Sequence, residues 1–306
     1  MIAYLFAGQA SQYVGMGRDL YEAFEESKAI FERANNALGF DIKEKCFNGP
    51  EDILKLTNIS QPAIVTVSIA AFAAFKAKVN PQLRIANFYA GLSLGEYTAL
   101  IAAGAFTFEE GIRLVRKRAE IMNEAALRQP GKMAAVIGLS VEEIKEICLK
   151  SGAEIANLNC PGQVVISGKI EAVDKAKDLC IEAGAKRVID LEVSGAFHSS
   201  LMRQAAEELK HFLEGISISS LSVPVISNYT AQPQDQSSQI KENLISQMYS
   251  AVRWEESIHF MLNQGVKTFY EFGPGKVLKG LMRKIDPNIE VISIEKKEDI
   301  LTISKS

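Results

Sequence analysis

Asn87-Phe-Tyr-Ala-Gly91-Leu-Ser93-Leu-Gly95-Glu-Tyr97 is the stretch that decides the fold. Its first five residues are typical of a strand, and an alanine-rich helix follows at once. The segment between them fits G-x-S-x-G, in which two glycines allow a tight turn from strand to helix. Such a turn exposes the Ser93 hydroxyl in front of the helix N-terminus, which carries free N–H groups and a partial positive charge. We therefore interpret Ser93 as a nucleophile; the alternative is a glycine-rich turn without chemistry.

Strands and helices alternate on both sides of this stretch. Residues 2–6 form an apolar run that predicts a buried strand, and residues 267–271 and 289–294 predict two more. Helices are expected over 19–38, 60–78, 107–127, 199–213, 238–249 and 254–264, with a polar loop at 229–238. Thr107 and Glu110 form a capping box at the start of one of these helices. This alternation predicts an α/β body with a parallel sheet.

The pattern changes between residues 132 and 191. Strands are expected at 133–139, 154–158, 164–167 and 187–191, with helices at 140–150 and 171–183. This order is βαββαβ, the ferredoxin-like arrangement. We therefore expect a ferredoxin-like subdomain over 129–194, inserted into a larger α/β domain formed by 1–128 and 195–306.

A serine nucleophile needs a base, normally histidine, and the chain has only three histidines. His211 and His259 lie among aliphatic residues within expected helices. His198 lies instead in the small-residue loop Ser194-Gly-Ala-Phe-His-Ser-Ser, and loops of this kind often carry functional side chains. By elimination, His198 is the candidate base. Asp190 is the nearest preceding Asp, but a backbone carbonyl can orient an imidazole equally well, and we favour the carbonyl.

Arg118 stands out from the other charged residues of its helix. Arg113, Lys117 and Glu124 belong to a solvated stripe, whereas Arg118 lies four residues from both Leu114 and Met122, on the apolar face. One interpretation is a snorkelling or salt-bridged side chain. The other is a buried cation whose planar fork binds a carboxylate in bidentate fashion.

Composition excludes several classes of function. Lys plus Arg number 34 against 37 for Asp plus Glu, so no basic footprint for nucleic acid is present. The four cysteines form no CxxC pair and indicate reduced thiols, and no metal-ligand cluster or dinucleotide fingerprint is found. The N-terminus lacks a signal-peptide pattern, and the apolar run 64–75 is shorter than the ~20 residues that span a bilayer. We expect a cytoplasmic protein that binds no membrane.

Further motifs accompany the serine turn in a fixed order along the chain. They are Gly8-Gln-Ala-Ser-Gln12, Gly91-Leu-Ser-Leu-Gly-Glu-Tyr97, Arg118 in Val-Arg-Lys-Arg, Asn159-Cys-Pro-Gly-Gln-Val-Val-Ile-Ser-Gly168, Gly195-Ala-Phe-His-Ser199, Gln247-Met-Tyr-Ser-Ala-Val-Arg-Trp254 and Gly273-Pro-Gly-Lys-Val-Leu278. Together they closely resemble the malonyl-CoA:acyl carrier protein transacylases of fatty acid synthesis and the acyltransferases of polyketide synthases. The resemblance covers nearly the whole chain, and it implies a hydrolase-like α/β body with a ferredoxin-like insertion.

The resemblance implies a role for each matching residue. It implies that Ser93 is acylated, that His198 is the general base and that the main-chain carbonyl of Gln247 orients the imidazole. The N–H groups of Gln9 and Leu94 would form the oxyanion hole. Arg118 would pair with the free carboxylate of the malonyl group.

The chain departs from the family pattern at a few positions. Leu92 stands where most members have His, Ala10 replaces a glycine and Ala7 replaces a proline. We expect these changes to alter the shape of the pocket more than its chemistry. Phe197 resembles the malonyl-selecting form of its motif, in which a large residue disfavours branched acyl groups.

The sequence thus predicts a ping-pong transfer of malonyl from malonyl-CoA, through Ser93, to the phosphopantetheine thiol of a separate acyl carrier protein. No bound cofactor or metal is expected, and the pathway is fatty acid or polyketide synthesis. Two alternatives stay open. One is an acyl hydrolase that clears carrier proteins, and the other is a non-catalytic carrier-binding module.

Overall fold

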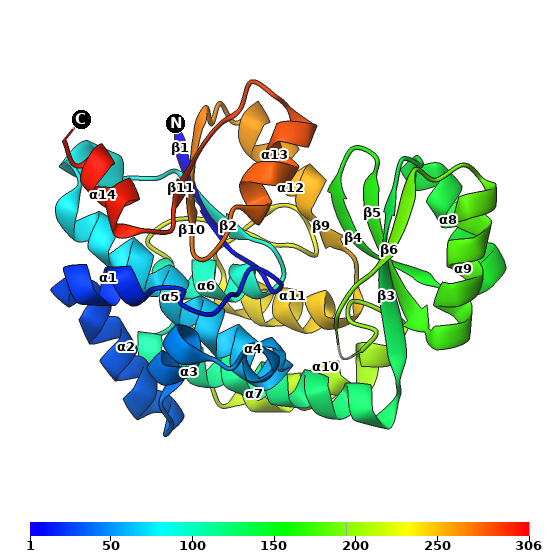
Figure 1. Ribbon diagram of the computed structural model, residues 1–306, viewed down its shortest axis with the longest axis horizontal. Coiled ribbons are helices and arrows are strands. Elements are labelled where there is room, and N and C mark those ends of the chain that lie inside the picture. The colour runs from blue at the N-terminus through cyan, green and yellow to red at the C-terminus, as the bar shows by residue number, and fades with distance from the viewer. Residues whose placement is uncertain (194, 306) are drawn as a thin grey trace.

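The computed structural model describes residues 1–193 and 195–305, and two β-sheets organise it (Figure 1). The larger sheet has the order β11-β10-β1-β2-β7-β8. Its strands from β11 to β7 run parallel, and β8 pairs antiparallel with β7. The bounds are β1 Ile2–Phe6, β2 Phe88–Gly91, β7 Val225–Ile226, β8 Pro233–Gln234, β10 Thr268–Phe272 and β11 Glu290–Ile294.

Helices cover both faces of the larger sheet, because successive side chains of a strand point to opposite sides. Tyr4 and Phe6 belong to the core that includes α5 (Thr57–Lys78), whereas Ala3 and Leu5 belong to the core that includes α12 (Trp254–Asn263) and α13 (Val277–Ile285). The other helices of this part are α1 Arg18–Ala23, α2 Glu25–Leu38, α3 Ile42–Asn48, α4 Glu51–Lys55, α6 Leu94–Ala102, α7 Phe108–Arg128, α10 Arg203–Glu214, α11 Ser237–Tyr249 and α14 Lys297–Ile303.

The helix α5 is long and apolar enough to cross a membrane by length and composition alone. It extends beyond the apolar run seen in the sequence, because residues 57–63 join the same helix. Most of it is buried within the protein: 78% of its most apolar window is covered. Its apolar side chains are therefore used by the core of the larger part.

The smaller sheet lies on the right of Figure 1 and has the order β6-β3-β5-β4-β9. Its first four strands pair antiparallel, and β9, which comes from far along the chain, pairs parallel with β4. Helices α8 and α9 pack against this sheet and against each other. The bounds are β3 Gly131–Ile137, α8 Val141–Ser151, β4 Glu154–Cys160, β5 Gln163–Lys169, α9 Ile170–Glu182, β6 Arg187–Asp190 and β9 Val252–Arg253.

Three local predictions were wrong or incomplete. The helix expected over 19–38 is two helices, because Phe24 takes an extended conformation with φ −131°. The helix expected from residue 199 starts as a 3₁₀ turn, Ser200–Met202, before α10. The polar loop at 229–238 contains the short strand β8. The predicted end of the inserted subdomain, residue 194, lies outside the described residues.

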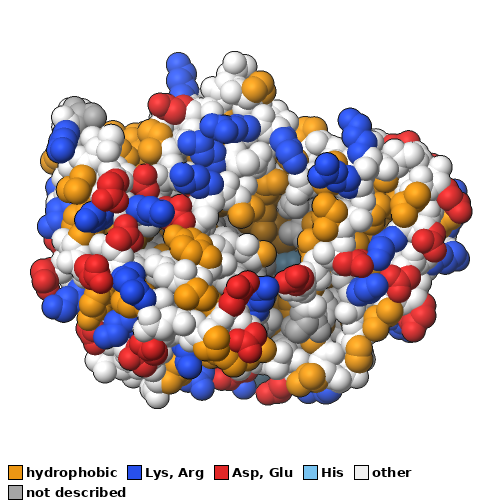
Figure 2. Space-filling view, in the orientation of Figure 1, with side chains coloured by type: hydrophobic (Ala, Val, Ile, Leu, Met, Phe, Trp, Pro, Cys, Tyr) orange, Lys and Arg blue, Asp and Glu red, His pale blue; other side chains and the backbone are white. Residues whose placement is uncertain are grey.

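A cavity of about 390 Å³ lies between the two parts of the molecule and takes residues from both. Gln9, Ser93 and Leu281 come from the larger part, and Met133 and Val165 come from the smaller. Figure 2 shows the hollow from outside, with hydrophobic side chains on its walls and a histidine at its floor. The fold therefore places the serine turn at the bottom of an interface between two sheets.

Candidate active site

The serine turn joins β2 to α6, as the sequence predicted. Ser93 adopts φ 51° and ψ −98°, and a positive φ is uncommon for a residue with a side chain. Asn228 holds the turn from both sides: its Oδ1 accepts from the Ser93 N–H at 2.6 Å, and its Nδ2 donates to the Gly91 carbonyl at 2.8 Å. Strain at Ser93 is thus maintained by contacts from a distant loop.

His198 meets this turn in the cavity, which both residues line. Its Nε2 lies 2.8 Å from the Ser93 Oγ, and its Nδ1 lies 2.7 Å from the carbonyl oxygen of Gln247. Because a carbonyl only accepts, Nδ1 carries the hydrogen and Nε2 is left as the acceptor for the serine hydroxyl. Burial, together with the positive charge of Arg118, lowers the pKa of His198 from 6.5 to about 4. The imidazole is therefore neutral near pH 7 and can accept a proton.

Asp190 forms its ion pairs with residues other than Ser93 and His198. It lies at the end of β6, where it forms ion pairs with Lys177 at 2.8 Å and Lys132 at 3.9 Å. The orienting acceptor on His198 is instead the Gln247 carbonyl, which is the kind of partner that the sequence analysis favoured.

Arg118 is 1% exposed and points into the site from α7. Its Nη1 donates to the Gln61 Oε1 at 2.7 Å, and its Nη2 donates to the Ser93 Oγ at 3.1 Å and the Gln247 Oε1 at 3.2 Å. Its guanidinium also lies over the ring of Tyr97, 4.9 Å from the centroid.

Among the described residues, the hydrogen-bond acceptors of the Arg118 guanidinium are uncharged and no carboxylate forms an ion pair with it, and its Nε has no hydrogen-bond partner there. Burial lowers the pKa of Arg118, and guanidinium nevertheless stays protonated in proteins. A buried cation without a direct counter-ion is costly, so this group is suited to receiving an anionic ligand beside Ser93.

The remaining predicted residues surround the same cavity. Gln9, Leu92 and Phe197 line it together with Ser93 and His198. Leu94 is the first residue of α6, and the first N–H groups of a helix have no partner within the helix. The arrangement brings together a hydroxyl, a neutral base, a helix N-terminus and a cation, which are the parts needed for acyl transfer with an anionic acyl group.

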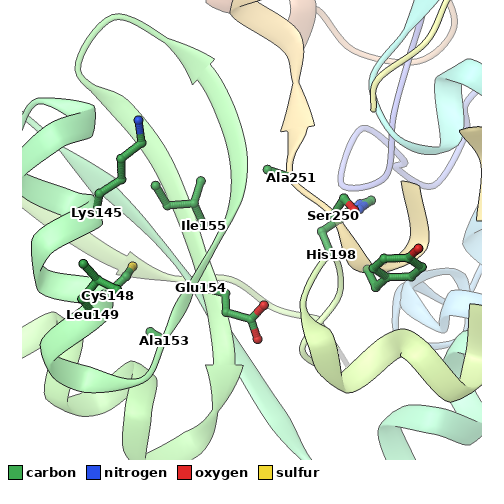
Figure 3. A pocket seen from close by; sticks show the side chains of 10 residues that line it. Lys145, Cys148, Leu149, Ala153, Glu154, Ile155, His198, Ser250 and Ala251 are labelled. Atoms are coloured by element: carbon green, nitrogen blue, oxygen red, sulfur yellow. The ribbon is translucent and has the colours of Figure 1, made fainter. Parts of the chain in front are cut away.

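A second cavity, of about 550 Å³, also reaches His198. It lies between α8 with the start of β4 on one side and residues 249–251 on the other (Figure 3). Its wall includes Glu154, whose carboxylate accepts hydrogen bonds from both the N–H and the hydroxyl of Ser200. This contact ties the smaller sheet to the segment that carries His198.

Sequence reasoning missed three polar residues of the site. Gln61 and Glu96 are fully buried, on α5 and α6, and Asn228 follows β7. Two signals were available: Gln61 immediately precedes the mostly apolar stretch of its helix, and Glu96 immediately follows the serine turn. Neither signal identifies a partner, since their contacts join segments far apart in the chain.

The chain matches the family described as acyl transferase domain over residues 3–289. It is 47% identical over 305 residues to a malonyl CoA-acyl carrier protein transacylase of Bacillus subtilis (strain 168), which covers 98% of this chain and 95% of that protein. A protein of the same description from Staphylococcus aureus (strain MRSA252) is 41% identical over 303 residues, with 97% of this chain and 96% of that one covered.

Solved structures give the same result. The malonyl CoA-acyl carrier protein transacylase of Coxiella burnetii superposes with a TM-score of 0.95 at 39% identity, over 99% of this chain and 96% of that one. A malonyl-transacylase in complex with its type II polyketide synthase acyl-carrier protein also has a TM-score of 0.95, at 37% identity, over 99% of both chains.

Proposed function

The chain belongs to the acyl transferase domain family and, within it, to the malonyl CoA-acyl carrier protein transacylases; on this premise we propose that it transfers a malonyl group from malonyl-CoA to the phosphopantetheine thiol of an acyl carrier protein. One observation carries the proposal. The Ser93 Oγ lies 2.8 Å from a neutral imidazole and 3.1 Å from a buried guanidinium. A nucleophile, its base and a carboxylate receptor thus meet at one oxygen.

The first half-reaction acylates Ser93. As the Ser93 Oγ forms a bond to the thioester carbon, its proton passes to the Nε2 of His198, 2.8 Å away. The carbonyl oxygen takes up negative charge, which the N–H groups of Gln9 and Leu94 stabilise. Losing one such donor raises the activation free energy by about 3 kcal/mol. The carbon–sulfur bond then breaks, and coenzyme A leaves as a thiol with the proton from His198.

The second half-reaction transfers the malonyl group to the carrier. The phosphopantetheine thiol gives its proton to His198 Nε2 as its sulfur attacks the ester carbon, and Ser93 recovers a proton as the ester bond breaks. The Gln247 carbonyl, 2.7 Å from Nδ1, keeps the ring in the same tautomer through both halves. Every bond change uses Ser93, His198 and the two substrates, so we propose that no bound cofactor or metal takes part.

Selectivity is assigned to Arg118, Phe197 and Leu92. The Arg118 fork pairs with the malonyl carboxylate, which supplies the anion that this buried cation lacks. Phe197 and Leu92 line the cavity around the acyl group and limit its size. An apolar Leu92 offers no polar contact to the substrate, so orientation depends on Arg118.

We further propose a hydrolase-like domain over 1–128 and 195–306 and a ferredoxin-like subdomain over 129–194. The serine turn after a parallel strand supports the first assignment. The strand order β6-β3-β5-β4, with α8 and α9 as connections, supports the second. A cytoplasmic location is supported by four unpaired, buried cysteines and by the burial of α5.

The experiment that tests the function measures transfer and hydrolysis on one sample. The protein is mixed with malonyl-CoA and a phosphopantetheinylated carrier, and malonyl-carrier and free malonate are followed together. Transfer is expected to exceed hydrolysis by far, and initial rates with both substrates varied should follow a ping-pong pattern. Predominant release of malonate would favour the acyl hydrolase, and no turnover at all would favour a carrier-binding module.

A further inference from the structure

Glu96 is a fully buried carboxylate one turn into α6, three residues beyond Ser93. It accepts three hydrogen bonds. Its Oε2 accepts from the Asn228 N–H at 3.0 Å and from the Gln247 Nε2 at 2.7 Å, and its Oε1 accepts from the Gln234 Nε2 at 2.6 Å. Burial of an ion is costly, so a buried carboxylate with three hydrogen-bond donors indicates a specific role.

Two of these three partners hold the reacting groups directly. Asn228 binds the backbone on both sides of the serine turn, at the Ser93 N–H and the Gly91 carbonyl. Gln247 donates its second Nε2 hydrogen to the Ser93 carbonyl at 3.0 Å, and its own carbonyl accepts from His198. Glu96 therefore connects the nucleophile's turn with the group that orients the base.

The side-chain amide of Gln247 links the Glu96 carboxylate to the Arg118 guanidinium. Gln247 accepts from the Arg118 Nη2 with its Oε1 while it donates to Glu96 with its Nε2. The order Arg118, Gln247, Glu96 thus fixes which way the amide of Gln247 points. Reversing the amide would set its N–H against the guanidinium and its oxygen against the carboxylate.

The three partners also define the charge of Glu96. All three are N–H donors, and a protonated acid would need an acceptor that these contacts do not offer. Burial raises the pKa of Glu96, and these donors and the Arg118 charge oppose that rise. The ionised form is the one that the hydrogen bonds fit, and it is the nearest compensation for the Arg118 charge.

We propose that Glu96 is a positioning residue of the transfer reaction: its carboxylate fixes Asn228 and Gln247 and so aligns Ser93, His198 and Arg118 together. This inference rests on the proposed function. The two remain distinguishable, because failure of the proposed function leaves the unaltered protein without Ser93 acylation, whereas failure of this inference leaves acylation equal in the protein and its Glu96 variants.

The main test is Glu96→Gln, which keeps the shape but places an amide N–H group among three donors. Acylation rates with malonyl-CoA and acetyl-CoA are measured per active site, so that misfolded protein is not counted. We expect kcat to fall about 10-fold or more with both donors, because Ser93 and His198 lose alignment. The malonyl-to-acetyl preference should also fall, because Gln247 no longer holds Arg118.

Glu271→Gln is the matched control. Glu271 is another buried carboxylate with three donors, namely the N–H groups of Leu278 and Lys279 and the Ser293 hydroxyl, and it contacts none of the reacting groups. The Glu271→Gln protein should lose folding stability as the Glu96→Gln protein does, but it should keep its preference for malonyl-CoA over acetyl-CoA. Equal effects of the two variants on that preference would overturn the proposal.

A milder variant covers the case in which Glu96→Gln does not fold. Gln234→Met removes the Oε1 contact of Glu96 and also the bond that the Gln234 Oε1 accepts from the Asn243 Nδ2; the printed bonds of the Gln234 side chain include none to Ser93 or His198. We expect kcat to fall about threefold or more although the change is remote from the nucleophile. A Gln234→Met protein with unaltered kcat for both acyl donors would refute the positioning role.

Discussion

Ser93, His198 and Arg118 come from three distant segments, and the state of each is set by a different neighbour. Asn228 fixes the backbone of Ser93, the Gln247 carbonyl selects the tautomer of His198, and Gln61 with Gln247 aims Arg118. Chemistry at single residues thus depends on uncharged amides and carbonyls, which hold direction without adding charge to a buried site. Two predictions about single residues follow from these contacts.

The first concerns selectivity. Arg118→Ala is expected to lower acylation by malonyl-CoA roughly 10- to 100-fold, because the malonyl carboxylate loses a charge-assisted pair in a buried pocket. Acylation by acetyl-CoA, which has no carboxylate, should hold or improve. Arg113→Ala is the control, since Arg113 lies exposed on the same helix. Equal losses with both acyl donors would assign Arg118 a structural role instead.

The second concerns pH. The pKa of His198 is lowered from 6.5 to about 4, so the imidazole should stay neutral far below pH 6. We therefore expect kcat/KM for malonyl-CoA to stay constant as the pH falls through 6 and to decline only near pH 4. Arg118→Ala should move this midpoint upward, since it removes one lowering cause, but not to 6.5, because burial remains.

The same shift affects folding stability. Between pH 6.5 and about 4 the unfolded chain protonates this imidazole and the folded chain does not, so this residue's contribution to stability falls as pH falls through that window. An acid limb of kcat/KM centred at or above pH 6.5 would contradict the assignment of a buried, neutral base.

At the scale of the element, the serine turn requires glycine because two backbones nearly touch. A Cβ on Gly95 would lie 2.2 Å from the carbonyl oxygen of Phe6, whereas a Cβ on Gly280, in α13, would meet nothing within 4 Å. The helix α6 can therefore approach β1 only if this position has no side chain.

This contact gives a prediction about stability. Gly95→Ala should lower the free energy of unfolding by roughly 1–3 kcal/mol, because the helix must move away from β1, and Ser93 acylation should be lost with it. Gly280→Ala should raise stability by about 0.5–1 kcal/mol, because Ala favours the helix and the space is open. Chemical denaturation of both variants checks this, and similar effects in both would refute the packing argument.

Elements with local signals could be predicted from the sequence. Capping boxes start α7 at Thr107 and α8 at Ser140, and both are present in the structure. The break at Phe24 could not be predicted, because α1 and α2 bury apolar residues at helical spacing on both sides of it. The strands β8 and β9 are two residues long, too short for any periodicity, and tertiary pairing alone defines them.

The candidate site divides in the same way. Ser93, His198 and Arg118 have local signatures, namely a turn motif, a small-residue loop and a cation on an apolar face. Asn228 has no such signature, and the place of Glu96 after the serine turn does not identify its partner, because their contact joins positions 132 residues apart. Polar networks of this kind are specified by tertiary contacts, so one sequence gives no sign of which residues they join.

At the scale of the whole molecule, the site lies where two sheets meet, and neither part forms it alone (Figures 1 and 2). Two kinds of contact hold the parts in register. The strand β9 of the C-terminal half pairs with β4, and Glu154 at the start of β4 binds Ser200, two residues after His198. We infer that the position of His198 relative to Ser93 depends on the smaller sheet.

This dependence gives a prediction for Glu154→Ala. Loss of the bonds to Ser200 should lower kcat about 3- to 10-fold, because the His198 segment loses its anchor, while KM for malonyl-CoA changes less. Glu207→Gln is the control, since Glu207 lies exposed on α10 away from the cavity. If Glu154→Ala and the control give the same kcat, the smaller sheet does not position the base.

The most direct test of the central claim is mass spectrometry of the protein after brief mixing with malonyl-CoA in the absence of a carrier. The account predicts a mass gain of one malonyl group on the peptide that contains Ser93, slow to form in His198→Ala and absent in Ser93→Ala. A protein that transfers malonyl to the carrier without any such adduct, or that carries it on a residue other than Ser93, would contradict the account.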